Sequence, residues 1–103
     1  MTESARRITI ETNHDSNQLV GELTRHTIMQ ITKKELKQLV AKERSIVNLQ
    51  QLTRIDTAGL AWLFYLFEHA NHVNCQLTFS HFPAKLDKLI RLSGVAGFLP
   101  EQR

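Results

Sequence analysis

The residues best suited to do chemistry lie in the segment RIDTAGL, residues 54–60. Aspartate and threonine are both preferred N-caps, so either Asp56 or Thr57 can begin a helix here. If Asp56 is the cap, its carboxylate accepts amides of the first turn and the Thr57 hydroxyl points outward, toward a partner. If Thr57 is the cap, its hydroxyl is used within the helix. The small Ala58 and Gly59 let the start of the helix approach a sheet or a partner closely.

The predicted helix over 58–72 has to serve two surfaces. One face carries large apolar residues that we assign to the core, namely Leu60, Leu63, Phe64 and Phe67. Trp62, Tyr65 and His69 lie on another face, and an aromatic pair that the core does not need is a candidate anchor for a partner. The alternative is that Trp62 only covers the edge of an adjacent helix. We predict a partner-binding surface that consists of Arg54, Asp56, Thr57, Ala58, Gly59, Ala61, Trp62 and Tyr65.

Other groupings of reactive side chains do not complete a site. His69 and His72 lie at helical spacing, but no cysteine and no carboxylate beyond Glu68 completes a metal-binding set. The four glycines are far apart or lack the lysine of a phosphate-binding loop. The single Cys75 permits neither an internal disulfide nor a cysteine zinc site. We therefore expect no metal, no cofactor and no enzyme activity.

Length, composition and charge limit the remaining possibilities. The 103 residues, 42% of them hydrophobic, are enough for one domain over 1–103 with one core. The longest apolar run, residues 60–67, is shorter than the about 20 residues that cross a bilayer, and the N-terminus has no apolar stretch typical of a signal peptide. These features predict a cytoplasmic protein.

The net charge is only +3, with 13 basic against 10 acidic residues. The densest basic cluster lies at helical spacing with glutamates among its members, which is typical of a solvated helix face. Its basic residues are Lys33, Lys34, Lys37, Lys42 and Arg44. Since a nucleic-acid surface is more concentrated and carries stacking aromatics, we expect an acidic protein surface as the partner instead.

The hydropathy pattern predicts an alternating order of elements. In sequence these are a hairpin over 8–23 with turn residues at 14–17, a helix from 27 or 32 to 44, a buried strand over 46–49, a polar connection over 50–54, a helix over 58–72, a strand over 76–80 and a helix over 84–93. Helices that alternate with buried strands favour an α/β layer with a mostly parallel sheet after the hairpin.

The segment VNLQQLTRIDTAGLAWLFYLFEHA, residues 47–70, resembles the signature region of STAS domains. The shared pattern is a strand that ends in a polar turn, then Asp, Ser or Thr, a small residue, Gly and Leu. The Gly21-Glu22-Leu23 end of the second strand and the short C-terminal tail are similar to the MlaB type, the cytoplasmic subunit of a bacterial ABC system for lipid asymmetry of the outer membrane.

This resemblance implies a SpoIIAA-like fold, with a four-stranded sheet and three helices packed against it. It also implies a non-catalytic regulatory subunit that binds the ATPase of the transporter, within a complex that contains a membrane permease and a lipid-carrier protein. Such a subunit reaches the inner membrane only through its partner and binds no nucleic acid.

The resemblance also leaves an alternative, an anti-sigma factor antagonist that is switched by phosphorylation. In that branch a Ser or Thr between the Asp and the Gly is phosphorylated, and here Ala58 leaves only Thr57 as a candidate. The preceding strand ends in Asn48-Leu49, so a second acidic group beside the site is missing. A phosphate on Thr57 would gain from the helix dipole but would be repelled by Asp56. The missing second hydroxyl at Ala58 and the missing acidic group at Asn48-Leu49 both favour the transporter branch.

Overall fold

The computed structural model describes residues 6–13 and 16–101. Two of the predicted turn residues, His14 and Asp15, lie outside the described residues. The strands are β1 (Ile8–Thr12), β2 (Asn17–Leu23), β3 (Arg44–Asn48), β4 (Leu52–Ile55) and β5 (Gln76–Ser80). The helices are a 3-10 turn, η2 (Ile28–Gln30), and the α-helices α1 (Lys33–Leu39), α2 (Thr57–His72) and α3 (Ala84–Leu92). The predicted α/β fold is confirmed.

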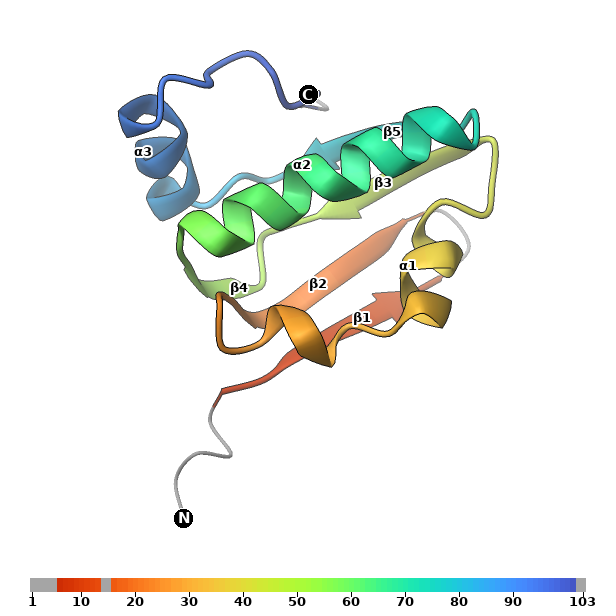
Figure 1. Ribbon diagram of the computed structural model, residues 1–103, viewed down its shortest axis with the longest axis horizontal. Coiled ribbons are helices and arrows are strands. Elements are labelled where there is room, and N and C mark those ends of the chain that lie inside the picture. Colours follow the sequence, from red (N-terminus) through yellow and green to blue (C-terminus); the bar gives the residue numbers. More distant parts are fainter. Residues whose placement is uncertain (1–5, 14–15, 102–103) are drawn as a thin grey trace.

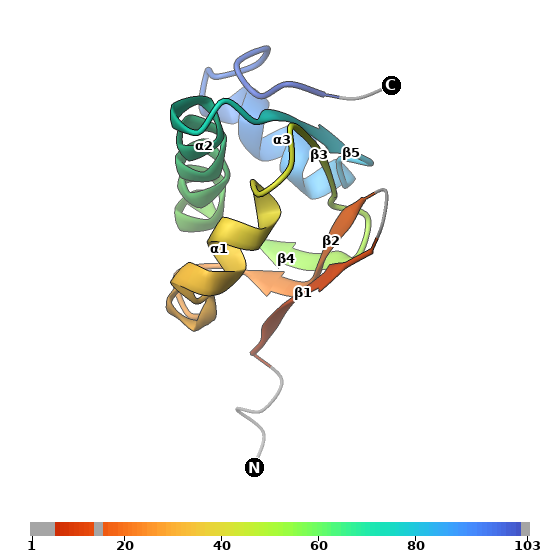
Figure 2. The same ribbon diagram turned by 90° about the vertical axis from the view of Figure 1, so that its right-hand side faces the viewer.

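The sheet is mixed, with an antiparallel hairpin followed by parallel pairs. Its order is β1-β2-β3-β5, and β4 pairs with β2 beside that path. Only β1 and β2 are antiparallel, with Ile8 opposite Gly21 and Thr12 opposite Asn17. Helices α1 and α2 lie on the same side of the sheet, and α3 packs beside the start of α2 (Figures 1 and 2). In the described part of the chain, no helix combines the length and the apolar character that crossing a membrane requires.

The sheet has five strands, so the predicted number of four is wrong. The missed strand is β4, in the segment predicted as a polar connection, because its two central residues are exposed and only its ends are apolar. Strand β2 pairs with β3 through its first half and with β4 through its second half. The register shifts between Gly21 and Glu22, and Gly21 has φ +113, a backbone conformation that favours glycine.

Helix α1 is shorter than predicted, since it ends at Leu39 rather than near Arg44. Of the two predicted starts, the later one is right: Thr32 accepts from the Glu35 amide at 3.1 Å and its own amide donates to the Glu35 carboxylate at 3.0 Å. The helix has to end early because β3 already begins at Arg44, which lies opposite Gln76 of β5. Consequently the predicted basic helix face is divided, with Lys42 and Arg44 outside the helix.

The core lies between the sheet and the inner faces of the helices. Its fully buried side chains include Leu19 and Leu23 of β2, Phe79 of β5, and Leu63 and Leu66 of α2. The prediction that Phe64 and Phe67 belong to the core is only partly right, because both are half-buried and pack against its edge. The buried face of α2 is instead completed by small residues at Gly59 and Ala70.

The start of α2 lies directly on the end of β2. A Cβ atom at Gly59 would overlap the backbone carbonyl oxygen of Leu23 and would lie 3.0 Å from the Ile55 side chain. Backbone atoms cannot move aside as a flexible side chain can, so only glycine fits this contact. Of the two small residues in the 54–60 segment, Gly59 therefore has a structural role.

We expect Gly59→Ala to lower the free energy of unfolding by about 1–3 kcal/mol, because the added methyl group must push α2 away from β2. Ala61→Ser, on the exposed face of the same helix, is the matched control and should cost no more than about 0.7 kcal/mol. Thermal and urea denaturation measure both changes. Equal stability of the two variants would contradict the contact.

Cys75 is buried, as predicted, directly before β5. Burial raises the pKa of the Cys75 thiol above its ordinary value of 9.0, since the thiolate loses its hydration. The native state therefore keeps the thiol neutral, while the unfolded chain releases its proton once the pH exceeds the ordinary value. The neutral thiol therefore makes its full contribution to the free energy of unfolding below the ordinary pKa, and this contribution is lost as the pH rises above that value.

We therefore expect the stability of the wild type to fall more steeply between about pH 8 and pH 10 than that of Cys75→Ala. Urea denaturation at several pH values measures the two slopes. Identical slopes would show that the thiol is accessible to solvent in the native state, as would rapid reaction of the folded protein with a thiol reagent.

Candidate functional site

Asp56 is the N-cap of α2, which decides between the two predicted caps. Its carboxylate oxygen Oδ1 accepts a hydrogen bond from the Gly59 amide at 2.9 Å. Thr57 is then the first helical residue, and its side chain is exposed. The hydroxyl of Thr57 can therefore donate to or accept from another molecule.

The second carboxylate oxygen of Asp56 ties the start of α2 to another segment. Oδ2 accepts a hydrogen bond from the backbone amide of Arg25 at 3.1 Å, across 31 residues of sequence. The two segments meet because β2 and β4 run in parallel, with Glu22 opposite Arg54 and Leu23 opposite Ile55. Asp56 thus bridges the loops that follow two neighbouring strands.

The loop that carries Arg25 is held by buried threonines. The Thr27 hydroxyl donates to the Glu22 carbonyl at 2.6 Å and accepts from the Thr24 amide at 3.0 Å. The Thr24 hydroxyl donates to the Glu22 carboxylate at 2.6 Å. Because Glu22, Thr24 and Thr27 are all buried, this turn is fixed from the inside while Arg25 and His26 remain exposed.

Sequence reasoning missed the contribution of this turn. A Thr-x-x-Thr pattern is common in loops and carries no sign of a distant partner, and the contact to Asp56 arises only from the pairing of β2 with β4. Glu22 offered a weak signal, because a glutamate at a strand end between apolar residues needs a buried partner.

The exposed face of α2 forms a stripe along the helix. Its residues recur every three or four positions, as one side of a helix requires, and they are Thr57, Ala61, Tyr65, Glu68 and His72. Tyr65 is 54% exposed, and its ring stacks on that of His69 with 6.4 Å between the ring centres. The stripe begins at the Thr57 hydroxyl and continues into an aromatic surface.

The predicted site residues fall into three groups by burial. Arg54, Thr57, Ala61 and Tyr65 are exposed; Asp56, Ala58 and Trp62 are half-buried; and Gly59 is buried. Trp62 packs against the core and keeps part of its surface accessible, so it is available both to the core and to a partner. Gly59 contributes to the surface only by placing the helix.

A shallow hollow lies along one edge of the stripe and includes part of it. It is lined by Ala61, Phe64, Tyr65, Phe67, Glu68 and Asn71. The half-buried rings of Phe64 and Phe67 supply its apolar floor, and both were predicted as core residues. The accessible apolar surface of α2 is therefore broader than the sequence indicated, and Ala61, Tyr65 and Glu68 are shared by the hollow and the stripe.

The two segments that meet at Asp56 carry exposed cations. Arg25 and Arg54 are exposed on the two strand-end segments, while both oxygens of Asp56 are engaged by backbone amides. The N-terminus of a helix carries a partial positive charge as well. This end of the molecule therefore favours an anionic group of a partner. In the described part of the chain, no group of His, Cys, Asp and Glu side chains is arranged to hold a metal ion.

We expect Asp56→Ala to lower the free energy of unfolding by about 1–2 kcal/mol, because it removes the cap of α2. Asp56→Asn keeps a cap oxygen for Gly59 but replaces the oxygen that Arg25 uses, so it should cost less while still exposing the Arg25 amide. Denaturation measures stability, and amide hydrogen exchange measures protection of Arg25. Unchanged protection in both variants would contradict the bridge.

Comparisons with known proteins identify the family and the fold. The family described as "Mlab, STAS domain" matches residues 7–101. No curated protein sequence matches the chain significantly. Among solved structures, the anti-sigma factor antagonist SpoIIAA in its unphosphorylated form superposes with a TM-score of 0.66 and 18% identity, covering 93% of this chain and 88% of that chain.

The Bacillus cell fate determinant SpoIIAA in its phosphorylated form superposes with a TM-score of 0.62 and 17% identity, covering 93% of this chain and 91% of that chain. At this identity the two structures establish the SpoIIAA-like fold alone. The family match extends over nearly the whole described chain. The chain belongs to the STAS domain family.

Proposed function

We propose that this STAS domain is a non-catalytic cytoplasmic subunit that binds the ATPase of an ABC transporter for phospholipids between membranes. Its contribution to outer-membrane lipid asymmetry is then regulatory, and it reaches the inner membrane only through the transporter. The matching family is described as an MlaB-type STAS domain, which supports the assignment to this transporter. The observation that carries the proposal is the exposed Thr57 at the start of a capped helix, continuous with accessible aromatic residues.

The surface fits a protein partner better than a small substrate. A rigid helix face with a broad, shallow apolar hollow buries one side of a partner but does not enclose a small molecule. The exposed cations Arg25 and Arg54, on the two segments that meet at Asp56, favour a carboxylate on the partner. A subunit that binds the folded ATPase stabilises it by mass action, so transport depends on the presence of the subunit.

The second candidate is an anti-sigma factor antagonist that is controlled by phosphorylation of Thr57. The observation that favours it is the likeness to SpoIIAA in both the unphosphorylated and the phosphorylated form, together with the exposed Thr57 hydroxyl. A phosphate on this residue would lie beside the helix N-terminus but also beside the Asp56 carboxylate. In this case Thr57 is a switch rather than a constant contact.

Affinity purification from cells, followed by mass spectrometry, separates the two candidates. The transporter proposal predicts that the tagged chain co-purifies with an ABC ATPase and its permease, and that Thr57 carries no phosphate. Recovery of an anti-sigma factor with phosphate on Thr57 would support the second candidate and contradict the first.

We expect Tyr65→Ala to weaken the complex with the ATPase by about ten-fold, since exposed aromatics often contribute most to an interface. The thermal midpoint of the isolated domain should hardly change, because Tyr65 is exposed. Leu92→Ala on α3 removes another exposed apolar side chain, 76% accessible, and is the matched control. Calorimetry or biolayer interferometry measures affinity; equal affinities of the two variants would move the interface away from α2.

Thr57→Glu is expected to weaken the same complex by about ten-fold or more, because a carboxylate at this position faces Asp56 and any carboxylate of the partner. Thr57→Ser keeps the hydroxyl and should bind within a few-fold of the wild type. If Thr57→Glu binds as well as Thr57→Ser, the start of α2 lies outside the interface.

A further inference from the structure

Strand β1 lies at an outer edge of the sheet. Among the residues that the structure describes, it pairs with no strand other than β2. The Glu22 amide donates to the Arg7 carbonyl at 2.8 Å, so the backbone groups of Arg7 face β2. Since successive residues of a strand direct these groups to opposite edges, the amides and carbonyls of Ile8, Ile10 and Thr12 point away from the sheet.

Gln30 binds the start of this edge through both polar atoms of its side-chain amide. Its Oε1 accepts a hydrogen bond from the Ile8 amide at 3.1 Å, and its Nε2 donates to the Arg6 carbonyl at 3.1 Å. One residue of a parallel neighbouring strand would use its own backbone carbonyl and amide for the same two bonds. The Gln30 side chain therefore takes the place of one residue of a further strand.

The turn after β2 fixes the position of Gln30. This residue ends η2, and its own amide donates to the Thr27 carbonyl at 2.8 Å. Thr27 and Thr24 are the buried residues that hold the turn from inside. The side-chain amide thus joins the edge of the sheet to a turn whose backbone is already held in place, so little backbone entropy is lost in making the contact.

The residues of β1 offer little other protection against a further strand. Natural edge strands are often protected by proline, lysine or a bulge. Strand β1 has the sequence ITIET, without proline or lysine, and its register with β2 is continuous. Isoleucine and threonine are also enriched in strands. Without the Gln30 side chain, this edge would therefore be a template for another strand.

The opposite outer strand of the sheet is covered as well. The Phe79 amide of β5 donates to the Pro100 carbonyl at 2.8 Å, and Phe79 forms a parallel bridge with Glu101. At β5 the cover is the backbone of the C-terminal segment, whereas at β1 it is one side chain. Both ends of the strand order β1-β2-β3-β5 are thus covered by this chain itself.

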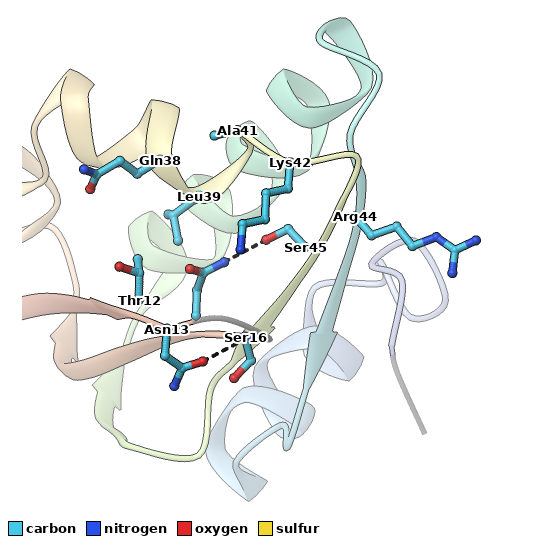
Figure 3. A pocket seen from close by; sticks show the side chains of 10 residues that line it. Thr12, Asn13, Ser16, Gln38, Leu39, Ala41, Lys42, Arg44 and Ser45 are labelled. Carbon is cyan, nitrogen blue, oxygen red and sulfur yellow. Dashed lines mark hydrogen bonds between the residues drawn. The ribbon is translucent and has the colours of Figure 1, made fainter.

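The partner that the β1 edge fits is a second copy of the chain. A two-fold axis would place β1 antiparallel to the same strand of the second copy, with Ile10 opposite Ile10. Figure 3 shows the Thr12 side chain pointing toward α1, and Ile10 lies on the same face because side chains alternate along a strand. The two Ile10 side chains would therefore meet on the helix side, and Glu11 would lie opposite Thr9 without like-charge repulsion.

We propose that Gln30 keeps the β1 edge closed to a second copy of this chain. In the alignment about Ile10, the Ile8 amide would donate to the Thr12 carbonyl of the second copy. In the single chain the same amide donates to Gln30, so the two states compete for one donor. The proposed function uses α2 and not this edge, and the two proposals stand or fall separately.

Hydrogen exchange of the Ile8 amide at low concentration, and sedimentation over a wide range of concentration, test the proposal on the full chain. The wild type should protect this amide and sediment as a single chain. Gln30 is exposed, so Gln30→Ala should fold; it should raise the exchange rate of the Ile8 amide about ten-fold and associate as the concentration rises. Gln38→Ala removes another exposed glutamine, on α1, and should behave as the wild type.

Thr12→Pro identifies the surface through which Gln30→Ala associates. Proline at this position removes only an amide that points outward, which an edge strand tolerates, so the double variant should remain a single chain. The proposal is overturned if the wild-type Ile8 amide is unprotected, if the wild type associates as strongly as Gln30→Ala, or if Gln30→Ala stays a single chain. It is also overturned if the double variant still associates, because the contact would then lie away from β1.

Discussion

The first turn of α2 lies on the carbonyl end of β2, with no side chain between the two backbones at Gly59. This contact determines where Asp56 can reach, since its carboxylate caps the helix and also holds the Arg25 amide. If α2 lay further from the sheet, Asp56 would lose its hydrogen bond to the Arg25 amide. The position of the exposed Thr57, and of the aromatic surface that follows it along α2, therefore depends on a missing side chain at residue 59.

The buried hydrogen bonds around Glu22 also help to position the start of α2, because they hold the turn whose Arg25 amide binds Asp56. Thr24 donates to one carboxylate oxygen of Glu22 and Thr27 donates to the Glu22 carbonyl, so these buried polar atoms are paired. The turn they hold presents Arg25 in a fixed orientation of its backbone. The backbone that carries the exposed Arg25 is thus held in place before a partner binds, so little backbone entropy is lost on association.

Much of this fold could be predicted from the sequence, because the hydropathy period of a long segment indicates whether it is a helix or a strand. The limits of α2 and β5 and the capping box at Thr32 follow from local patterns. The short β4 could not be predicted, since a strand of four residues with exposed central positions is defined by its partner β2. For the site, the pattern indicated the cap and the exposed hydroxyl, whereas the role of Arg25 required knowledge of which strands are neighbours.

The division of β2 between two partners sets the length of the segment that joins β3 to β4. Residues 49–51 carry the chain from one parallel pairing to the next, and Gln51 already accepts a bond from the Gly21 amide at 3.1 Å. Since successive strand residues face opposite sides, one inserted residue there would turn Leu52 outward and Thr53 inward. Insertions and fusion points for this domain therefore have to avoid residues 49–51.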